Sequence, residues 1–403
     1  MTNLQEPIEN ERPSIDGDEF QLEHVATVAG AHFVHDTYTG FLPVLLPIIR
    51  DNLAISNSLA GSLIVWSQAP SLLNPFIGYI ADRISVRYFI ILAPAITGTL
   101  MSLLGLANSY VAMAMILFAT GLSIAGFHAP APALIGRVAG KNTGRGMSIF
   151  MAGGELGRTL GPLIIAFTVQ RMGFGGVWGL SIVGWIVSGV LYYRLKNLSI
   201  KPATKAQVPF KTLWPQAQNY FLILFWLMGF RALLIMSMTV WLPTFMQDVI
   251  GASVTISSWS LSIVEAAGVV GALFAGTLSD RVGRRPMLMG LLLVAPLLGL
   301  AFVNSSGWVS IVLMILIGIT VISPTPVIMA SVQDQFPDNR AFANGVMLAI
   351  NFVTRGIAIW GVGFLADRIG FESAFYWSCL IALLSLPATF LLPLGNKKEI
   401  KTG

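Results

Sequence analysis

The chain has 403 residues, of which 55% are hydrophobic and only 11% are charged, and its net charge is +5. A soluble domain carries about 25% charged residues, so this composition excludes an ordinary water-soluble globule and indicates an integral membrane protein. The single cysteine, Cys379, excludes an intramolecular disulfide. With only four scattered histidines in the chain, a structural zinc or iron–sulfur site is not expected, and we predict no metal and no cofactor.

The first 24 residues are acidic and have no basic start before an apolar stretch, so they predict a disordered tail rather than a signal peptide. After this tail, apolar runs of about 20 residues follow one another to the end of the chain. They predict twelve spans, at about 25–49, 58–81, 88–107, 110–136, 146–170, 176–195, 218–247, 256–279, 286–304, 308–333, 341–366 and 373–394.

The basic residues gather in alternate connections between the spans. If the N-terminus is cytoplasmic, the only basic residues in the outside loops are Arg50, Arg171 and Arg368. Short loops rich in Lys and Arg stay cytoplasmic, so we expect both termini on the cytoplasmic side of the cell inner membrane. Topology explains the net positive charge, and no nucleic-acid partner is expected. The predicted organisation is a tail (1–24), a six-helix bundle (25–195), a linker (196–217), a second six-helix bundle (218–394) and a tail (395–403).

The second half of the chain repeats the first. The segment from Gly78 to Arg87 is answered by Gly276 to Arg285 at an offset of 198 residues, and Arg158 by Arg355 at an offset of 197. Two parallel repeats of this kind predict a substrate site near the middle of the membrane, between the halves.

The repeated segment resembles the signature of the major facilitator superfamily, which reads Gly, three residues, Asp-Arg, one or two residues, then Gly-Arg-Arg. The resemblance implies an all-α membrane fold of two parallel six-helix repeats, and a conformational latch between spans 2 and 3 of each half. An alternative is a basic loop that only sets topology. The first copy departs from the signature at Ser85 and Val86. The latch candidates are Gly78, Asp82, Arg83, Gly276, Asp280, Arg281, Arg284 and Arg285.

A narrower resemblance covers the first half. His32 and Asp36 in span 1, Phe127-His128 before Pro130 in span 4, and the Gly-rich run 148–163 that opens span 5 are similar to the fosmidomycin-resistance type of efflux transporter. The run is similar to a motif of the superfamily's proton antiporters. Glu155 and Arg158 depart from the pattern, so the resemblance does not carry over a substrate.

Ionisable residues inside the spans need a partner or water, because each costs at least about 2.5 to 3.5 kcal/mol at the bilayer centre. His32 and Asp36 are one helical turn apart, so the carboxylate can hold a proton-exchanging imidazole. The alternative is a buried structural pair. Glu155 and Arg158 are three residues apart, and either neutralise each other within one helix or exchange protons in response to substrate.

His128 precedes prolines that interrupt span 4, as Pro324 and Pro326 interrupt span 10, and such breaks are tolerated against protein or a cavity. We therefore predict that His128 lines the cavity, with a packing role as the alternative. The proton-coupling candidates are Asp36, Glu155, His32 and His128. Arginine binds carboxylates and phosphates in a bidentate way. The substrate-cavity candidates are Arg158, Arg231, Glu265 and Arg355, with pairing of an arginine to Glu265 as the alternative role.

Together, these features predict a secondary active transporter, not an enzyme, that exports a small amphipathic or anionic compound in exchange for protons by alternating access. Proton-driven uptake of an organic anion is a second possibility, suggested by the arginines. A receptor that no longer transports, and a membrane enzyme with His32, His35, Asp36 and His128 as metal ligands, are more remote. The expected partners are the substrate, protons and the lipid bilayer, and the family resemblance implies a monomer.

Overall fold

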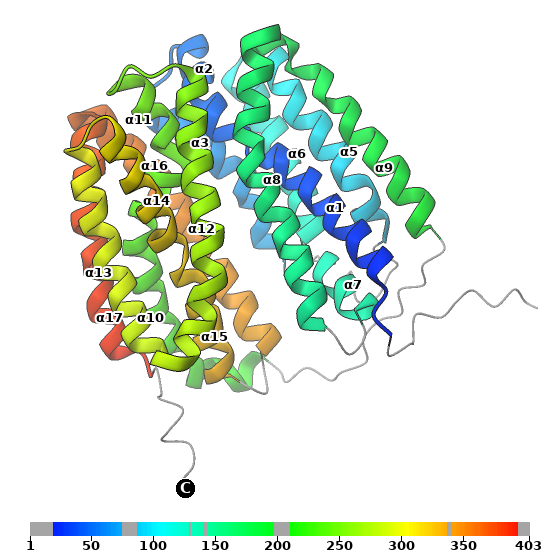
Figure 1. Ribbon diagram of the computed structural model, residues 1–403. Coiled ribbons are helices and arrows are strands. Elements are labelled where there is room, and N and C mark those ends of the chain that lie inside the picture. Colours follow the sequence, from blue (N-terminus) through cyan, green and yellow to red (C-terminus); the bar gives the residue numbers. More distant parts are fainter. Residues whose placement is uncertain are drawn as a thin grey trace, which may run out of the picture.

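The computed structural model describes residues 19–74, 87–128, 130–139, 143–196, 210–336 and 340–393, and in these ranges all regular structure is helical. The helices form two bundles that lie side by side (Figure 1). We call the end of the molecule where α1 begins and α17 ends the terminal face, and the opposite end the far face. The two expected repeats correspond to the two bundles.

The first bundle contains six membrane-crossing segments, several of them built from two helices. Its elements are α1 (Leu22–Thr39) with α2 (Leu42–Leu53), α3 (Asn57–Gln68) with the 3₁₀ turn η1 (Ala69–Leu73), α5 (Arg87–Leu103), α6 (Tyr110–His128) with α7 (Ala131–Val138), α8 (Thr143–Met172), and η4 (Phe174–Leu180) with α9 (Ser181–Leu195).

The second bundle repeats this order. Its elements are α10 (Phe210–Met236) with η5 (Ser237–Trp241) and α11 (Leu242–Asp248), α12 (Val254–Val282), α13 (Arg284–Val303), α14 (Trp308–Ile322) with α15 (Pro324–Gln335), α16 (Arg340–Ala382), and η7 (Leu383–Ser385) with α17 (Leu386–Leu391). Because α10 begins at Phe210, its first turns lie in the segment predicted as a linker, whose residues 197–209 are outside the described ranges.

The helices are interrupted where the sequence predicts interruptions. The predicted interruptions at His128 and Ser323 are present, as the junctions α6–α7 and α14–α15. Helix α16 has 43 residues, which at 1.5 Å per residue is about twice the thickness of the hydrocarbon core. It contains a turn at Gly370, where φ is +80°, a conformation that favours glycine. The eleventh and twelfth spans are therefore the parts of α16 on either side of Gly370, the latter continued by α17.

Eight of the described segments are long and apolar enough to cross a membrane by length and composition. Helices α1 and α8 are outside this set, and they carry the charged residues Asp36, Glu155 and Arg158. Charged residues lower the mean hydropathy of a helix and are costly within a membrane, so these residues need partners in the bundle.

The hydrophobic core shows where the two bundles meet. The largest cluster contains residues of both, among them Phe41 and Leu45 of the first bundle and Trp241 and Phe375 of the second. Two further clusters lie toward the terminal face, and each belongs to one bundle: one around Val25 and Phe127, the other around Phe221 and Val327. The core is therefore continuous near the far face and divided near the terminal face. Among the described residues, the bundles are closed against each other at the far face and lie apart at the terminal face (Figure 1).

Polar contacts hold the far face closed. Arg50 at the end of α2 binds both carboxylate oxygens of Asp248 at the end of α11, with Nη2 3.0 Å from Oδ1. The carboxylate of Asp367 accepts hydrogen bonds from the backbone N–H groups of Asn57 and Ser58, each at 2.8 Å, at the start of α3. A helix N-terminus favours a negative charge, so Asp367 of α16 caps a helix of the other bundle. The hydrogen bond with the Asp248 carboxylate raises the pKa of Arg50 above its ordinary value, so this pair remains charged.

We predict that Arg50→Ala shifts the protein toward states with an open far face. The pair is bidentate but partly exposed, so we assign it about 1 kcal/mol, which changes the ratio of two conformations about fivefold. Spin labels on Asn52→Cys and Ile250→Cys in a Cys379→Ala background would show a larger population at long distance. The exchanged pair Arg50→Asp with Asp248→Arg should restore the parent distribution. An unchanged distribution in Arg50→Ala would show that the pair does not hold this face.

Candidate functional site

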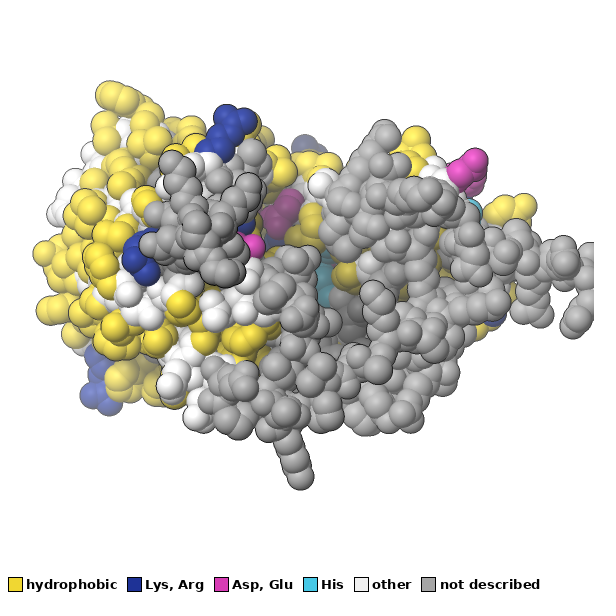
Figure 2. Space-filling view, turned by 90° about the horizontal axis from the view of Figure 1, so that it is seen from below, with side chains coloured by type: hydrophobic (Ala, Val, Ile, Leu, Met, Phe, Trp, Pro, Cys, Tyr) yellow, Lys and Arg dark blue, Asp and Glu magenta, His cyan; other side chains and the backbone are white. Residues whose placement is uncertain are grey.

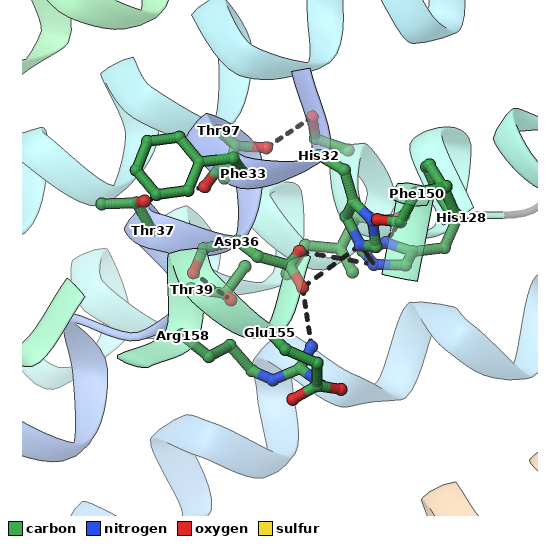
Figure 3. A network of polar contacts seen from close by, with 12 residues as sticks. His32, Phe33, Asp36, Thr37, Thr39, Thr97, His128, Phe150, Glu155 and Arg158 are labelled. Carbon is green, nitrogen blue, oxygen red and sulfur yellow. Dashed lines mark hydrogen bonds and ion pairs between the residues drawn. The ribbon is translucent and has the colours of Figure 1, made fainter. Parts of the chain in front are cut away.

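Asp36 lies at the centre of a buried network of polar side chains. It is on α1, about midway along the first span, and is 2% exposed. Its Oδ2 is 2.7 Å from Nη1 of Arg158 on α8 and 3.3 Å from Nε2 of His32, and its Oδ1 is 3.4 Å from Nε2 of His128 at the end of α6 (Figure 3). Three helices therefore supply cationic or proton-binding groups to one carboxylate.

Close packing of α1 against α8 makes this network possible. Glycines of α8 face the α1 backbone, so that a Cβ at Gly153 or Gly157 would overlap the carbonyl oxygen of Ala29 or Phe33. A Cβ at Gly154 would overlap the imidazole of His32. Small residues allow two helices in a membrane to approach closely. The Gly-rich run that the sequence singled out is thus what brings Arg158 within reach of Asp36.

Backbone carbonyls orient both histidines. Nδ1 of His32 is 2.8 Å from the carbonyl oxygen of Phe150, and Nδ1 of His128 is 3.0 Å from that of Ile124. The two Nε2 atoms are 3.3 Å apart. The His32 ring also stacks on the Phe150 ring, with centroids 4.1 Å apart. Each ring is fixed with Nδ1 toward the backbone and Nε2 toward Asp36.

His35 differs from these two, as its place on another face of the helix predicts. It is fully buried, and neither of its ring nitrogens has a hydrogen-bond partner. Its ring stacks on Phe127 with centroids 4.6 Å apart. His35 is therefore a packing residue beside the network.

Arg158 bridges two carboxylates. Its Nη1 binds Asp36, and its Nη2 forms an ion pair with Glu155, three residues earlier on α8. The side chain of Arg158 is 35% exposed and that of Glu155 is 22% exposed, against 3% for Asp36. The network therefore runs from a buried carboxylate to a more accessible one. Viewed from the terminal face, the molecule is hollowed between the bundles, and acidic and histidine side chains are visible in this recess (Figure 2).

The second bundle contributes further charges near this network. Glu265 of α12 interacts electrostatically with Arg158, with Glu155 and with Arg355 of α16. Near it, the Ser262 hydroxyl donates to the carbonyl oxygen of Thr159 at 2.8 Å, which ties α12 to α8. Arg231 of α10 lies deeper, at 5% exposure. Its Nη2 donates to the carbonyl oxygen of Val321 at 3.0 Å and to the hydroxyl of Thr325 at 2.8 Å, beside the break between α14 and α15.

The predicted latches are described only in part. Gly78, Asp82 and Arg83 lie outside the described residues. Gly276 and Asp280 belong to α12, and the side chain of Asp280 is also outside the description. In the second copy, Nε of Arg284 is 3.2 Å from Oδ2 of Asp334 on α15, and Arg284 also binds the hydroxyl of Ser279. Arg285 donates to the carbonyl oxygens of Thr389 and Leu392, both at 3.1 Å. Arg281 is exposed. Arg284 and Arg285 thus connect the start of α13 to α15 and α17 within the second bundle.

The fold agrees with a comparison against protein families. The family model of the Major Facilitator Superfamily matches residues 28–322 and 245–402, which together span both bundles. The chain belongs to the major facilitator superfamily. Members of this superfamily and the relatives below are transporters, so the protein is a multi-pass membrane transporter of small molecules by a secondary mechanism, and not an enzyme.

Two relatives in sequence cover nearly the whole chain. The fosmidomycin resistance protein of Escherichia coli is 24% identical over 388 residues, which are 93% of this chain and 94% of that protein. The uncharacterized MFS-type transporter YfnC of Bacillus subtilis is 23% identical over 377 residues, 91% of each chain. The first of these confirms the resemblance to the fosmidomycin-resistance type.

Solved structures show the same superfamily fold. A bacterial homolog of the human lysosomal transporter Spinster, in an inward-facing and occupied conformation, superposes with a TM-score of 0.78 at 15% identity, over 95% of this chain and 99% of that one. A D-xylose–proton symporter superposes with a TM-score of 0.74 at 17% identity, over 95% and 99% of the two chains.

We predict that Gly154→Ala destabilises the site, because the added methyl group meets the His32 ring, which Phe150 and Asp36 hold in place. Overpacking of this kind costs about 1 to 3 kcal/mol, so thermal unfolding of the detergent-solubilised protein should occur at a lower temperature. Gly189 on α9 provides the control, since a Cβ there meets nothing within 4 Å. Gly189→Ala should unfold at or above the parent temperature. Equal unfolding temperatures for Gly154→Ala and Gly189→Ala would contradict the packing described for α1 and α8.

Proposed function

We propose that the protein exports a small amphipathic or anionic compound in exchange for protons, by alternating access of the recess between the bundles. The observation that carries this proposal is the position of Arg158, one guanidinium held between two carboxylates, buried Asp36 and more accessible Glu155. Proton-driven transport needs a group that gains and loses a proton as the site is exposed to either side, and whose charge affects substrate binding.

The network offers a direct way to couple the two ligands. When both carboxylates are ionised, they share Arg158, Asp36 through Nη1 and Glu155 through Nη2. Protonation of one carboxylate removes its attraction, and the guanidinium then pairs with the other carboxylate or with an anionic group of the substrate. His32 and His128, each with Nε2 within 3.4 Å of Asp36, are further proton carriers in this proposal. A bound anion and a bound proton therefore act on the same cation.

The opposite wall of the recess fits a substrate with a negative group. Arg355 and Arg231 add two cations from the second bundle, and Glu265 offsets one of them. Arginine is suited to carboxylates and phosphates because its fork binds two oxygens at once. The same arginines favour a second candidate function, proton-driven uptake of an organic anion. The direction of net flux in a defined proton gradient separates export from uptake.

The name of the E. coli relative supports the direction chosen here, since resistance to a compound follows from its removal from the cell. The solved D-xylose–proton symporter, which is named for its coupling to protons, has the same fold. The fold is therefore compatible with proton coupling. We therefore include fosmidomycin, hydrophobic cations and organic anions in a panel for thermal stabilisation of the purified protein. The compound class that raises the unfolding temperature is the substrate class to be used in flux measurements.

We place the terminal face in the cytoplasm, in the inner membrane, because the Lys- and Arg-rich connections lie on the side of the termini. The described conformation is then open to the cytoplasm and closed to the outside by Arg50, Asp248 and Asp367. The protein acts as a monomer, with the site between its own two bundles. The segments at Gly78–Arg83 and Gly276–Arg285 act as latches on the cytoplasmic side when the bundles rock.

We predict that Asp36→Asn and Glu155→Gln each abolish gradient-driven flux in proteoliposomes, because an amide cannot exchange a proton with the site. Exchange of labelled for unlabelled substrate across the membrane should be partly retained, since it needs no net proton movement. His35→Ala is the matched control on the same helix, buried but outside the network, and should be mild. Normal gradient-driven flux in both carboxamide variants would sink the coupling assignment.

A further inference from the structure

Three lone pairs converge at one point of the site. Nε2 of His32, Nε2 of His128 and a carboxylate oxygen of Asp36 lie within 4.8 Å of one another. The two nitrogens are 3.3 Å apart, and the carboxylate is 3.3 Å from His32 through Oδ2 and 3.4 Å from His128 through Oδ1. Oδ1 of Asp36 is buried and makes no well-formed hydrogen bond; it faces Nε2 of His128 at 3.4 Å, which can donate to it only when that nitrogen carries a hydrogen. A buried carboxylate oxygen without a donor is rare and calls for an explanation, such as an ion.

The backbone determines which atoms of the imidazoles are available. A carbonyl oxygen only accepts, so the contacts of Nδ1 with Phe150 and Ile124 place a hydrogen on Nδ1 of both His32 and His128. In the neutral rings, Nε2 then carries no hydrogen. Three acceptors therefore face one another at hydrogen-bond distance, an arrangement that is repulsive unless a proton or a metal cation lies among them.

The separations match those of a tetrahedral metal site. Zinc binds histidine nitrogen at about 2.0 to 2.1 Å and carboxylate oxygen at about 2.0 to 2.2 Å, which places neighbouring ligand atoms of a tetrahedron about 3.3 to 3.5 Å apart. The 3.3 Å between the two nitrogens lies in this range. The contacts with Asp36, 3.3 Å and 3.4 Å, are to different oxygens, so an ion would meet either both carboxylate oxygens or one oxygen after a small rotation of the carboxylate. Two nitrogens and an oxygen also form a donor set that suits zinc and its neighbours in the first transition series.

The surroundings of the three ligands favour a cation as well. Metal-binding histidines commonly donate their other ring N–H to a backbone carbonyl, as His32 and His128 do here. Asp36, Glu155 and Arg158 together carry one negative charge when ionised, so Arg158 does not by itself make the site positive. The side chain of His128 is 34% exposed, which gives an ion access from the recess.

We propose that His32, Asp36 and His128 form a tetrahedral binding site for a divalent transition-metal ion of the zinc class, with its fourth position open to the recess. This departs from the expectation of no metal, because His32 and Asp36 of α1 need a third ligand from another helix. His128 of α6 is that ligand. The metal and a proton occupy the same lone pairs, so they are alternative ligands of one site. Metal binding needs neither a gradient nor a substrate, and can be present in a protein that proves not to use protons.

The test uses the purified full-length protein without an affinity tag, stripped of metal and titrated with Co²⁺. We expect one ion per chain, with the intense visible absorption of four-coordinate cobalt, and its displacement by Zn²⁺. His128→Ala should weaken Co²⁺ binding by more than the roughly 10- to 100-fold that loss of an outer partner of a metal ligand costs. His35→Ala, which changes a buried histidine next to the site, should bind Co²⁺ as the parent does.

Two further observations keep the result clear if His128→Ala folds poorly. His128→Cys retains a donor atom, and should bind Co²⁺ with an added sulfur-to-metal charge-transfer band, which only direct ligation produces. Binding by Asp36→Asn should also be weakened. Co²⁺ bound with parent affinity by folded His128→Ala, the spectrum of six-coordinate aqueous cobalt in the parent, or no sulfur band in folded His128→Cys would overturn the proposal. None of these outcomes bears on proton-coupled flux, which is measured separately.

Discussion

The charge of Asp36, held within the membrane, is the constraint on which the site depends. A carboxylate at 2% exposure near the middle of a span is tolerated only with partners, and Asp36 has Arg158, His32 and His128. To bring these groups together, α8 must approach α1 as closely as glycine allows. Helix α6 must also end where the side chain of His128 reaches α1. The Gly-rich run and the prolines after His128 are thus explained by the same carboxylate.

The contacts between the two bundles differ at the two ends of the molecule. As a result, the site is open only toward the terminal face. Near the far face, a continuous apolar core is joined by the Arg50–Asp248 pair and by Asp367 at the start of α3. Near the terminal face, each bundle has its own core. Opening of the far face thus requires breaking a few polar contacts together with an apolar contact, which is the kind of two-state interface that alternating access needs.

Much of the fold could be predicted from the sequence, because hydropathy marks the spans and the 198-residue repeat marks the halves. The His32–Asp36 contact could be predicted from the helical period. The helix breaks at His128 and Ser323 could be predicted from the prolines that follow them. The pairing of Arg158 with Asp36 could not be derived in this way, since 122 residues separate them and local spacing pairs Arg158 with Glu155. The metal-ligand geometry also depends on the tertiary approach of α6 to α1.

The far-face pair was missed although the sequence contained a signal for it. Arg50 and Asp248 are 198 residues apart, the same offset as the repeat, so they occupy equivalent positions in the two halves. Equivalent residues near a pseudo-twofold axis lie close to each other, and opposite charges at such positions attract. Arg50, one of few basic residues in the connections at the far face, could therefore have been paired with its repeat mate.

Proton movement in everted membrane vesicles shows whether Asp36 couples transport to protons. With the vesicle interior acidified by respiration, a compound that the protein exports should enter the vesicles and collapse the pH gradient, as reported by a pH-sensitive dye. The account predicts this collapse with the wild-type protein and none with Asp36→Asn at equal expression. Equal collapse with Asp36→Asn, or uptake of the compound by wild-type vesicles with no change in the gradient, would contradict it.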